Sequence, residues 1–433
     1  MAARWAGVAV LPIVLSACGS SAPAGSMSTS MASSGEDSGA STTSSTNAAS
    51  SGVMSVNASD ATTDAPSTTM PSPSDAASEA LADGESSSEH GTSDGGMEMT
   101  SPSDGAVDGG ATLNAAVVSL MRRVADYQLE SVDDEKDWIH GAMWTGIMAT
   151  YQITGDAKYL TAIKNWAGPG WTLADGAASR GDDQCAAQTY FDAYLLDPTP
   201  ANMVMLAGAK PSFDQIVANP PAGRVAWWWQ DALFMVPPGF VRLGAATGDT
   251  AYVSVLDGMW WDTYAFLFDT TKGLMYRDDM HRTAFWGRGN GWVVAAIARV
   301  LEYLPADDAK RANYVTMLAS MATALKPVQG SDGMWRSNLL VPTQYPNPET
   351  SGSGLITYGI AWGVHHGVLD RATYLPVVDK AWQGLTTVVG ANGFVGYVQP
   401  VGSAPGPAAA TDTAPYGVGA FLLAASEVAS LLP

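Results

Sequence analysis

The segments "TYQITGDAKYL", residues 150–160, and "RLGAATGDTAYV", residues 242–253, share the pattern Thr-Gly-Asp-x-x-Tyr. An apolar run precedes each pattern, and an amphipathic run follows it. Glycine often ends a helix in the left-handed conformation, and aspartate often caps the first turn of a helix. Each pattern therefore predicts a corner where one helix ends and the next begins.

Looser versions of this corner recur near Asp197, Pro305 and Asp370, roughly 40 to 65 residues apart, which suits stacked helical hairpins. The segments that precede the corners, and one at the C-terminus, become aliphatic after a polar or aromatic start; they are 140–151, 183–195, 228–245, 290–304, 355–368 and 416–431. Amphipathic partners follow the corners, for example at 307–325 and 373–389, and 113–129 supplies a final one. Six inner and six outer helices predict an all-α (α/α)6 barrel, with only short hairpins such as "GLMYRDD" (273–279) in its loops.

The region before the predicted barrel has a different composition. Residues 1–18 combine an early Arg4, an apolar run and small residues, which is typical of an export signal. Leu15-Ser16-Ala17-Cys18 resembles the bacterial lipobox, whose cysteine is lipidated; the alternative is an ordinary signal peptide. Residues 19–112 are rich in Ser, Thr, Gly, Ala and Asp and contain no Phe, Trp or Tyr, so we predict a disordered tether.

These features predict three parts: a lipoprotein signal peptide (1–18), a disordered linker (19–112) and an (α/α)6 domain (113–433). The expected location is that of an exported bacterial lipoprotein, anchored to a membrane through Cys18 and facing the periplasm or the cell exterior. The net charge of the chain is −21, and the domain after the linker is also net acidic. A partnership with nucleic acid is therefore not expected, although one arginine could still bind an anionic substrate.

Polar and aromatic residues gather at the starts of the six inner segments. The stretches are "DWIHGAMWTG" (137–146), "GDDQCAAQTY" (181–190), "WWWQDALFM" (227–235), "FWGRGNGW" (285–292), "NPETSGSG" (347–354) and "TAPYGVGAF" (413–421). In a barrel these starts meet at one end, where aromatic rings and polar groups suit the apolar faces and hydroxyl edges of a sugar. His140 and Trp144, in the first stretch, are candidates for substrate binding.

Asp231 is the leading candidate for catalysis. On a helix, Trp227 precedes it by one turn and Met235 follows it by one turn, so its carboxyl would lie among apolar neighbours. Desolvation there favours the protonated form, which a general acid requires. An ion pair with an arginine, or a cap on a helix end, would equally explain this aspartate.

Three further residues have two interpretations each. Asp182 and Asp183 could form a two-carboxylate site with Asp231, or could cap a helix. Arg288, among glycines, could bind a substrate carboxylate, or could pack on Trp286 or Trp292.

No metal or other cofactor is predicted. The chain has no His-x-x-x-His pair and no cysteine cluster. His365 and His366 are adjacent, and on a helix their side chains would diverge. If Cys18 carries lipid, Cys185 is the one remaining thiol.

Seven blocks of the chain resemble, in family order, the unsaturated rhamnogalacturonyl hydrolases of glycoside hydrolase family 105 and the related unsaturated glucuronyl hydrolases of family 88. The blocks are "GDDQCAAQTY", "WWWQDALFMVPP", "LMYRDD", "FWGRGNGWVVAAIARVLEYLP", "DGMWRSNLL", "YPNPETSGSG" and "YGVGAFLLAASEV". The resemblance covers nearly everything from about residue 113 onward. It implies the (α/α)6 fold and a substrate made by lyases, namely a pectin oligosaccharide of the rhamnogalacturonan type that ends in an unsaturated uronic acid.

The resemblance also implies a mechanism and a set of residues. An aspartate protonates C4 of the C4=C5 bond and takes a proton from the water that attacks C5; the hemiketal then opens, without a metal or a covalent intermediate. Asp231 matches this aspartate. Asp182 is assigned as the second acid and Asp183 as a substrate contact, an order that one sequence leaves interchangeable. The other matched substrate contacts are Trp229, Met235, Arg288 and Trp292.

Two positions depart from the family pattern. Arg277 follows Tyr276 where many members have histidine, and Gln230 stands where close relatives often have cysteine. Both departures concern the sugar beyond the cleaved bond. The alternatives are a hydrolase or epimerase of another sugar on the same barrel, and a glycan-binding lipoprotein without activity; the retained Asp231 and acidic pair argue against the latter.

Overall fold

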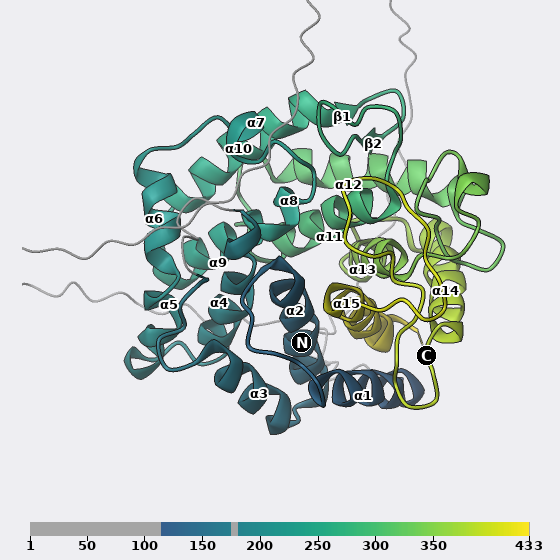
Figure 1. The fold of residues 1–433 in the computed structure, drawn as a ribbon. Coiled ribbons are helices and arrows are strands. Elements are labelled where there is room, and N and C mark those ends of the chain that lie inside the picture. Colours follow the sequence, from purple (N-terminus) through teal and green to yellow (C-terminus); the bar gives the residue numbers. More distant parts are fainter. Residues whose placement is uncertain (1–113, 175–180, 433) are drawn as a thin grey trace, which may run out of the picture. The chain divides into compact units, whose positions relative to one another are not determined.

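In the computed structural model, which describes residues 114–174 and 181–432, six helices form an inner ring (Figure 1). They are α2 (Trp138–Thr154), α4 (Ala186–Leu196), α9 (Pro237–Thr247), α11 (Gly287–Tyr303), α13 (Thr350–His365) and α15 (Pro415–Leu431). Each packs on the next in chain order, and α15 packs on α2, which closes the ring. The predicted (α/α)6 barrel is confirmed.

The outer helices pack around this ring (Figure 1). They are α1 (Ala115–Leu129), α3 (Ala157–Ala167), α5 (Val204–Ala207), α6 (Lys210–Ala218), α10 (Ala251–Leu267), α12 (Arg311–Leu325) and α14 (Arg371–Thr387). As predicted, the first helix closes the barrel, because α1 packs on α15 and α2. Short 3₁₀ turns lie at Asp182–Gln184, Pro200–Met203, Lys326–Val328 and Pro342–Gln344.

The repeated Thr-Gly-Asp pattern forms the predicted corners. Gly155 and Gly248 end α2 and α9 with φ of 64° and 74°, in the left-handed region that favours glycine. Asp156 then accepts a hydrogen bond from the backbone N–H of Lys158 (3.2 Å), at the start of α3. Asp249 accepts one from Ala251 (2.9 Å), at the start of α10.

The third inner segment is broken, unlike the continuous helix that was predicted over 228–245. It contains α8 (Ala232–Met235) and α9, which Pro237 begins, and the short helix α7 (Gly223–Ala226) precedes it. Proline lacks an N–H and fixes its own φ, so it suits the first turn of a helix and interrupts a longer one. The residues from Trp227 to Gln230 are not helical, so Trp227 does not lie one turn before Asp231, and that prediction was wrong.

One antiparallel hairpin interrupts the helical pattern. Its strands are β1 (Phe268–Asp269) and β2 (Leu274–Met275), with Phe268 opposite Met275. This is the short hairpin expected at "GLMYRDD". Within the described ranges, the helices are all too short or too polar to cross a membrane. The predictions for Cys18 and for the tether at 19–112 lie outside the described residues and stay predictions.

Candidate active site

Asp231 lies immediately before α8, with Asp182 and two arginines close enough for their charges to act on it. Its Oδ1 atom is buried and has no hydrogen-bond partner among the described residues. Burial raises the pKa of this carboxyl to about 6, although the positive charges of Arg277 and Arg288 act in the opposite direction. Such a carboxyl keeps its proton in mildly acidic solution, as a proton donor must.

Asp182 and Asp183 lie on the 3₁₀ turn that precedes α4, and both are partly exposed. Of the two, Asp182 adds to the raised pKa of Asp231 through its negative charge. The preceding Gly181 lies against the Trp229 ring, because a Cβ added there would be 3.5 Å from it. The structure therefore brings Asp182 and Trp229 together with Asp231, and the role of Asp182 as the second acid stays a prediction.

Gln230 is fully buried beside Asp231. Its backbone N–H donates to the carbonyl of Arg277 (2.8 Å), which fixes the turn before α8. Its amide lies against Gly289 of α11, where an added Cβ would be only 1.7 Å from Nε2. A glycine is thus required for this close approach, and the amide has no partner among the described residues.

Arg288 lies in the first turn of α11 (Gly287–Tyr303) and is 1% exposed. Its Nη1 donates to the carbonyl of Gln399 (2.6 Å) and to the hydroxyl of Tyr416 (3.0 Å). Its guanidinium lies 4.4 Å from the centre of the Trp286 ring. The alternative interpretation, in which Arg288 packs on Trp286, describes this arrangement; its role in binding a carboxylate stays a prediction.

Met235 and Trp292 are each 1% exposed. Trp292 packs on Phe234 of α8, with 4.6 Å between ring centres, and lies edge-on to Trp138 at 6.5 Å. These contacts fix α8 against α11 and α2. The structure thus places both predicted substrate contacts in the packed layer that supports Asp231.

His140 and Trp144 lie about one turn apart on α2 and have different neighbours. Both ring nitrogens of His140 have carboxylate partners, Asp137 at 2.7 Å and Asp133 at 3.1 Å. Burial opposes the charged ring, but the hydrogen bond and charge of Asp137 raise the pKa of His140 above its ordinary value. Trp144 stacks on Trp166 of α3 at 4.9 Å and is 2% exposed, so it packs between the layers in place of the predicted substrate contact.

Arg277 and Asp278 were not assigned to the site from the sequence, although Arg277 had been noted as a departure from the family. Both charges act on Asp231. Asp278 is 1% exposed, forms an ion pair with Arg277 and accepts hydrogen bonds from His281. The only sequence feature that drew attention to this pair was Arg277, which stands where many family members have histidine. That difference did not show that Arg277 lies near Asp231.

A comparison with known protein families identifies the family of this chain. The model of Glycosyl Hydrolase Family 88 matches residues 113–432. The chain belongs to glycosyl hydrolase family 88. It is therefore a glycoside hydrolase of the family 88 and 105 type, as the resemblance implied.

Two curated relatives of the hydrolase are named unsaturated 3S-rhamnoglycuronyl hydrolase. The one from Formosa agariphila is 33% identical over 320 residues, which cover 68% of this chain and 85% of the relative. The one from Alteromonas sp. (strain LOR) is 32% identical over 325 residues, which cover 68% and 78%. A solved family 88 glycosyl hydrolase from Bacteroides vulgatus is 33% identical, with a TM-score of 0.68, and covers 73% of this chain and 99% of that one.

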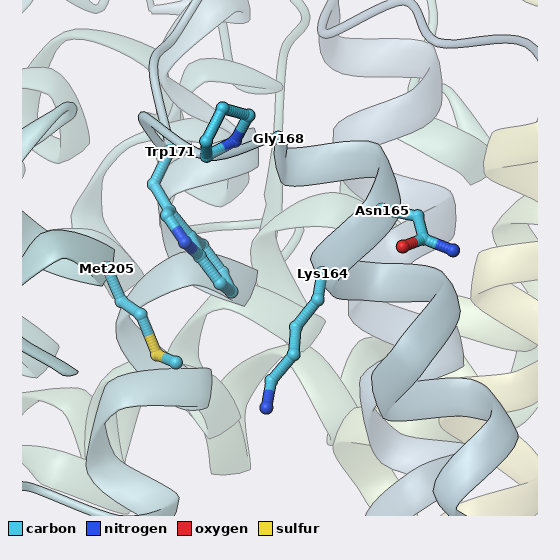
Figure 2. Close-up of a pocket in the computed structure, with 6 residues that line it drawn as sticks. Lys164, Asn165, Gly168, Trp171 and Met205 are labelled. Atoms are coloured by element: carbon cyan, nitrogen blue, oxygen red, sulfur yellow. The ribbon is translucent and has the colours of Figure 1, made fainter. Parts of the chain in front are cut away.

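A hollow on the outer layer of the hydrolase contains none of the carboxylates described above. It has a volume of about 410 Å³ and is lined by Lys164, Asn165, Gly168, Pro169, Trp171 and Met205 (Figure 2). These residues belong to α3, α5 and the loop after α3. The hollow therefore has no part in the chemistry at Asp231.

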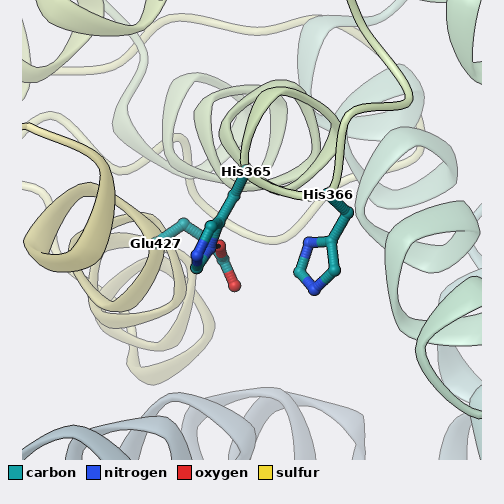
Figure 3. A group of neighbouring side chains, drawn as sticks. All are labelled: His365, His366 and Glu427. Atoms are coloured by element: carbon teal, nitrogen blue, oxygen red, sulfur yellow. Dashed lines mark hydrogen bonds and ion pairs between the residues drawn. The ribbon is translucent and has the colours of Figure 1, made fainter. Parts of the chain in front are cut away.

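The two adjacent histidines lie closer together than predicted. Because α13 ends at His365, the ring of His366 lies only 5.0 Å from that of His365, and the expected divergence was wrong (Figure 3). The Nδ1 of His365 pairs with Glu427 (2.9 Å), and the Nδ1 of His366 donates to the Trp362 carbonyl (3.0 Å). Two groups of side chains are spaced closely enough to hold a metal ion: His365, His366 and Glu427, and separately Glu135, Asp137 and His140. Neither group includes Asp231 or Asp182.

Proposed function

We propose that this hydrolase removes a terminal Δ4,5-unsaturated uronic acid from lyase-generated oligosaccharides in which rhamnose is the next sugar. The observation that carries the proposal is Asp231, a buried carboxyl whose pKa is raised to about 6, with the charge of Asp182 beside it. The rhamnoglycuronyl names of two relatives at about one-third identity support rhamnose as the second sugar. Membership in a glycoside hydrolase family argues against the epimerase and the binding-protein alternatives.

In the proposed mechanism, hydration of the double bond leads to cleavage. The Asp231 carboxyl donates its proton to C4, and a water molecule attacks C5. The Asp231 carboxylate then takes the proton that this water loses, so the acid is restored. The resulting hemiketal at C5 opens to a ketone, and the former ring oxygen becomes the hydroxyl of a hemiacetal at C1. This hemiacetal collapses to an aldehyde, which breaks the glycosidic C1–O bond: the hydroxyl proton passes to the leaving oxygen, so the second sugar regains its hydroxyl and the hydrated first sugar leaves as an open-chain product. Burial, and with it the negative charge of Asp182, raises the pKa of Asp231 and keeps its carboxylate basic enough to recover the proton.

One candidate substrate is an oligosaccharide of the rhamnogalacturonan type, with an unsubstituted rhamnose. The second candidate has a modified rhamnose, and the prefix "3S" in the names of the two relatives favours it. The two candidates differ in the second sugar and not in the bond that is cleaved. One assay therefore serves for both.

The purified enzyme is expected to abolish the ultraviolet absorbance of an unsaturated uronyl-rhamnose disaccharide. Hydration destroys the conjugation between the C4=C5 bond and the carboxylate, so the chromophore is lost as the sugars separate. The saturated disaccharide, analysed by mass spectrometry, is the control and should remain intact. If neither rhamnose substrate loses its chromophore, but an unsaturated disaccharide with another second sugar does, rhamnose is the wrong assignment.

The activity should fall as the pH rises above about 6. The group that donates the proton must be protonated in the free enzyme, and burial raises the pKa of Asp231 to about 6. The value of kcat/KM should therefore lose about tenfold per pH unit on the basic side. A profile that stays flat from pH 5 to pH 8, measured by initial rates, would remove Asp231 from the role of proton donor.

A further inference from the structure

Arg277 is a charged group beside Asp231 that the mechanism above does not use. Two contacts fix the backbone near Arg277. The carbonyl of Arg277 accepts a hydrogen bond from the N–H of Gln230 (2.8 Å), and Met275, two residues earlier, exchanges two hydrogen bonds with the amide of Asn290. The Nε–H of Arg277 is buried and has no partner among the described residues. An unsatisfied buried donor is costly, and a bound acceptor would remove that cost.

The guanidinium of Arg277 is held in place by its neighbours. Its Nη1 pairs with Asp278, whose carboxylate is itself fixed by the backbone N–H groups of Met280 and His281. One face of the guanidinium lies over the Trp228 ring, 5.2 Å from its centre. Trp228 is 41% exposed, an unusual state for so large an apolar side chain.

The two arginines near Asp231 differ in exposure. Arg288 is 1% exposed, and the carbonyls of Gln399 and Pro400 accept its hydrogen bonds. The side chain of Arg277 is 16% exposed, and its guanidinium contacts the exposed ring of Trp228. A terminal uronate at Asp231 has its second sugar on the solvent side, because the rest of the oligosaccharide continues there. Arg277 and Trp228 therefore lie where the second sugar would bind.

We propose that Arg277 and Trp228 form a subsite for a sulfate ester on the rhamnose next to the terminal uronate. This inference rests on the proposed function. Rhamnose has no ionisable group of its own, so an ester supplies the only anion that a guanidinium could bind on that sugar. The fork of an arginine matches the oxygens of such an oxyanion, and an indole ring suits the apolar face of a deoxy sugar.

The test compares two unsaturated disaccharides that differ only in sulfation of the rhamnose. Wild type is expected to prefer the sulfated one. Arg277→Gln should lower kcat/KM for the sulfated substrate by about tenfold to a hundredfold more than for the unsulfated one, the range of a charge-assisted hydrogen bond. The ratio of the two losses is the readout, because removing the charge of Arg277 near Asp231 affects both substrates alike. Arg277→Lys, which keeps a charge beside buried Asp278, should lose less.

Arg282→Gln is the matched control. Arg282 belongs to the same loop and pairs with exposed Asp279, and its side chain is 40% exposed. This variant should leave both rates unchanged. Thermal unfolding of each variant shows whether removing a partner of Asp278 has damaged the loop.

Binding gives a readout that does not depend on turnover. In an Asp231→Asn background, calorimetry should show tighter binding of the sulfated disaccharide, and Arg277→Gln should abolish that preference. An equal loss on both substrates would assign Arg277 to the uronate carboxylate and overturn the inference, as would a wild type that prefers the unsulfated substrate. If binding prefers the sulfated sugar but no chromophore is lost, the proposed function fails and the subsite stands.

Discussion

Replacing Asp231 by asparagine is expected to lower kcat by about two to four orders of magnitude, the contribution that a positioned general acid makes. Asparagine has nearly the same shape but cannot donate a proton to carbon or accept one from water. The folded state should not suffer, because the pKa of the carboxyl is raised to about 6 by burial. A carboxyl with a raised pKa costs stability once it ionises, so at pH 7 the variant should unfold at the wild-type temperature or above it.

Asp257→Asn is the matched control for this experiment. Burial raises the pKa of Asp257, like that of Asp231, to about 6, but Asp257 lies on α10 and accepts a hydrogen bond from Tyr314 (2.9 Å) on the outer helix α12. The control variant should keep kcat within about twofold, since its carboxyl has no substrate to protonate. If Asp231→Asn retains more than a tenth of the wild-type kcat, another group delivers the proton and the assignment of Asp231 is wrong.

The barrel was predictable because its corners are encoded locally. Gly155 and Asp156, like Gly248 and Asp249, need only their own backbone conformations to end one helix and cap the next. The third inner helix was not predictable in the same way. Its apolar pattern continues through the break before α9. Pro237 shows only that a helix starts or ends nearby, and it does not show that the five residues from Trp227 to Asp231 are not helical.

Candidate site residues could be predicted where their own type and their neighbours in the sequence indicate a chemical role. Asp231 and Asp182 were both predicted from the sequence, and the structure adds that Asp182, at a separation of 49 residues in the chain, acts on Asp231 through its charge. Arg277 was missed because its approach depends on β2 and on the amide of Asn290, which hold the loop against α11. Trp144 was misplaced, because the stretch that contains it has aromatic residues on both faces of α2, and only the packing of α3 shows which face is which.

A buried ion network fixes α8, the short helix that Asp231 immediately precedes. Asp192 of α4 is 3% exposed and pairs with Arg242 of α9 (2.6 Å) and Arg299 of α11 (3.1 Å). Arg299 donates to the Gln188 amide oxygen (2.7 Å), and Gln188 donates in turn to the carbonyl of Phe234 in α8 (2.7 Å). The charges at the centre of the barrel are thus linked to the turn that positions Asp231.

Asp192→Asn should therefore destabilise the enzyme by about 3–5 kcal/mol, because it leaves two buried arginines without their carboxylate. For a domain of this size the loss corresponds to a melting temperature about 4–8 °C lower. Asp279→Asn breaks a pair whose carboxylate is 66% exposed, so it should cost less than about 1 kcal/mol. Below its melting temperature, Asp192→Asn should also lower kcat more than it raises KM, since it loosens α8 and not the surface that contacts sugar. A variant that melts with wild type would mean that Glu302, which already contacts Arg242 at 3.3 Å, neutralises the network alone.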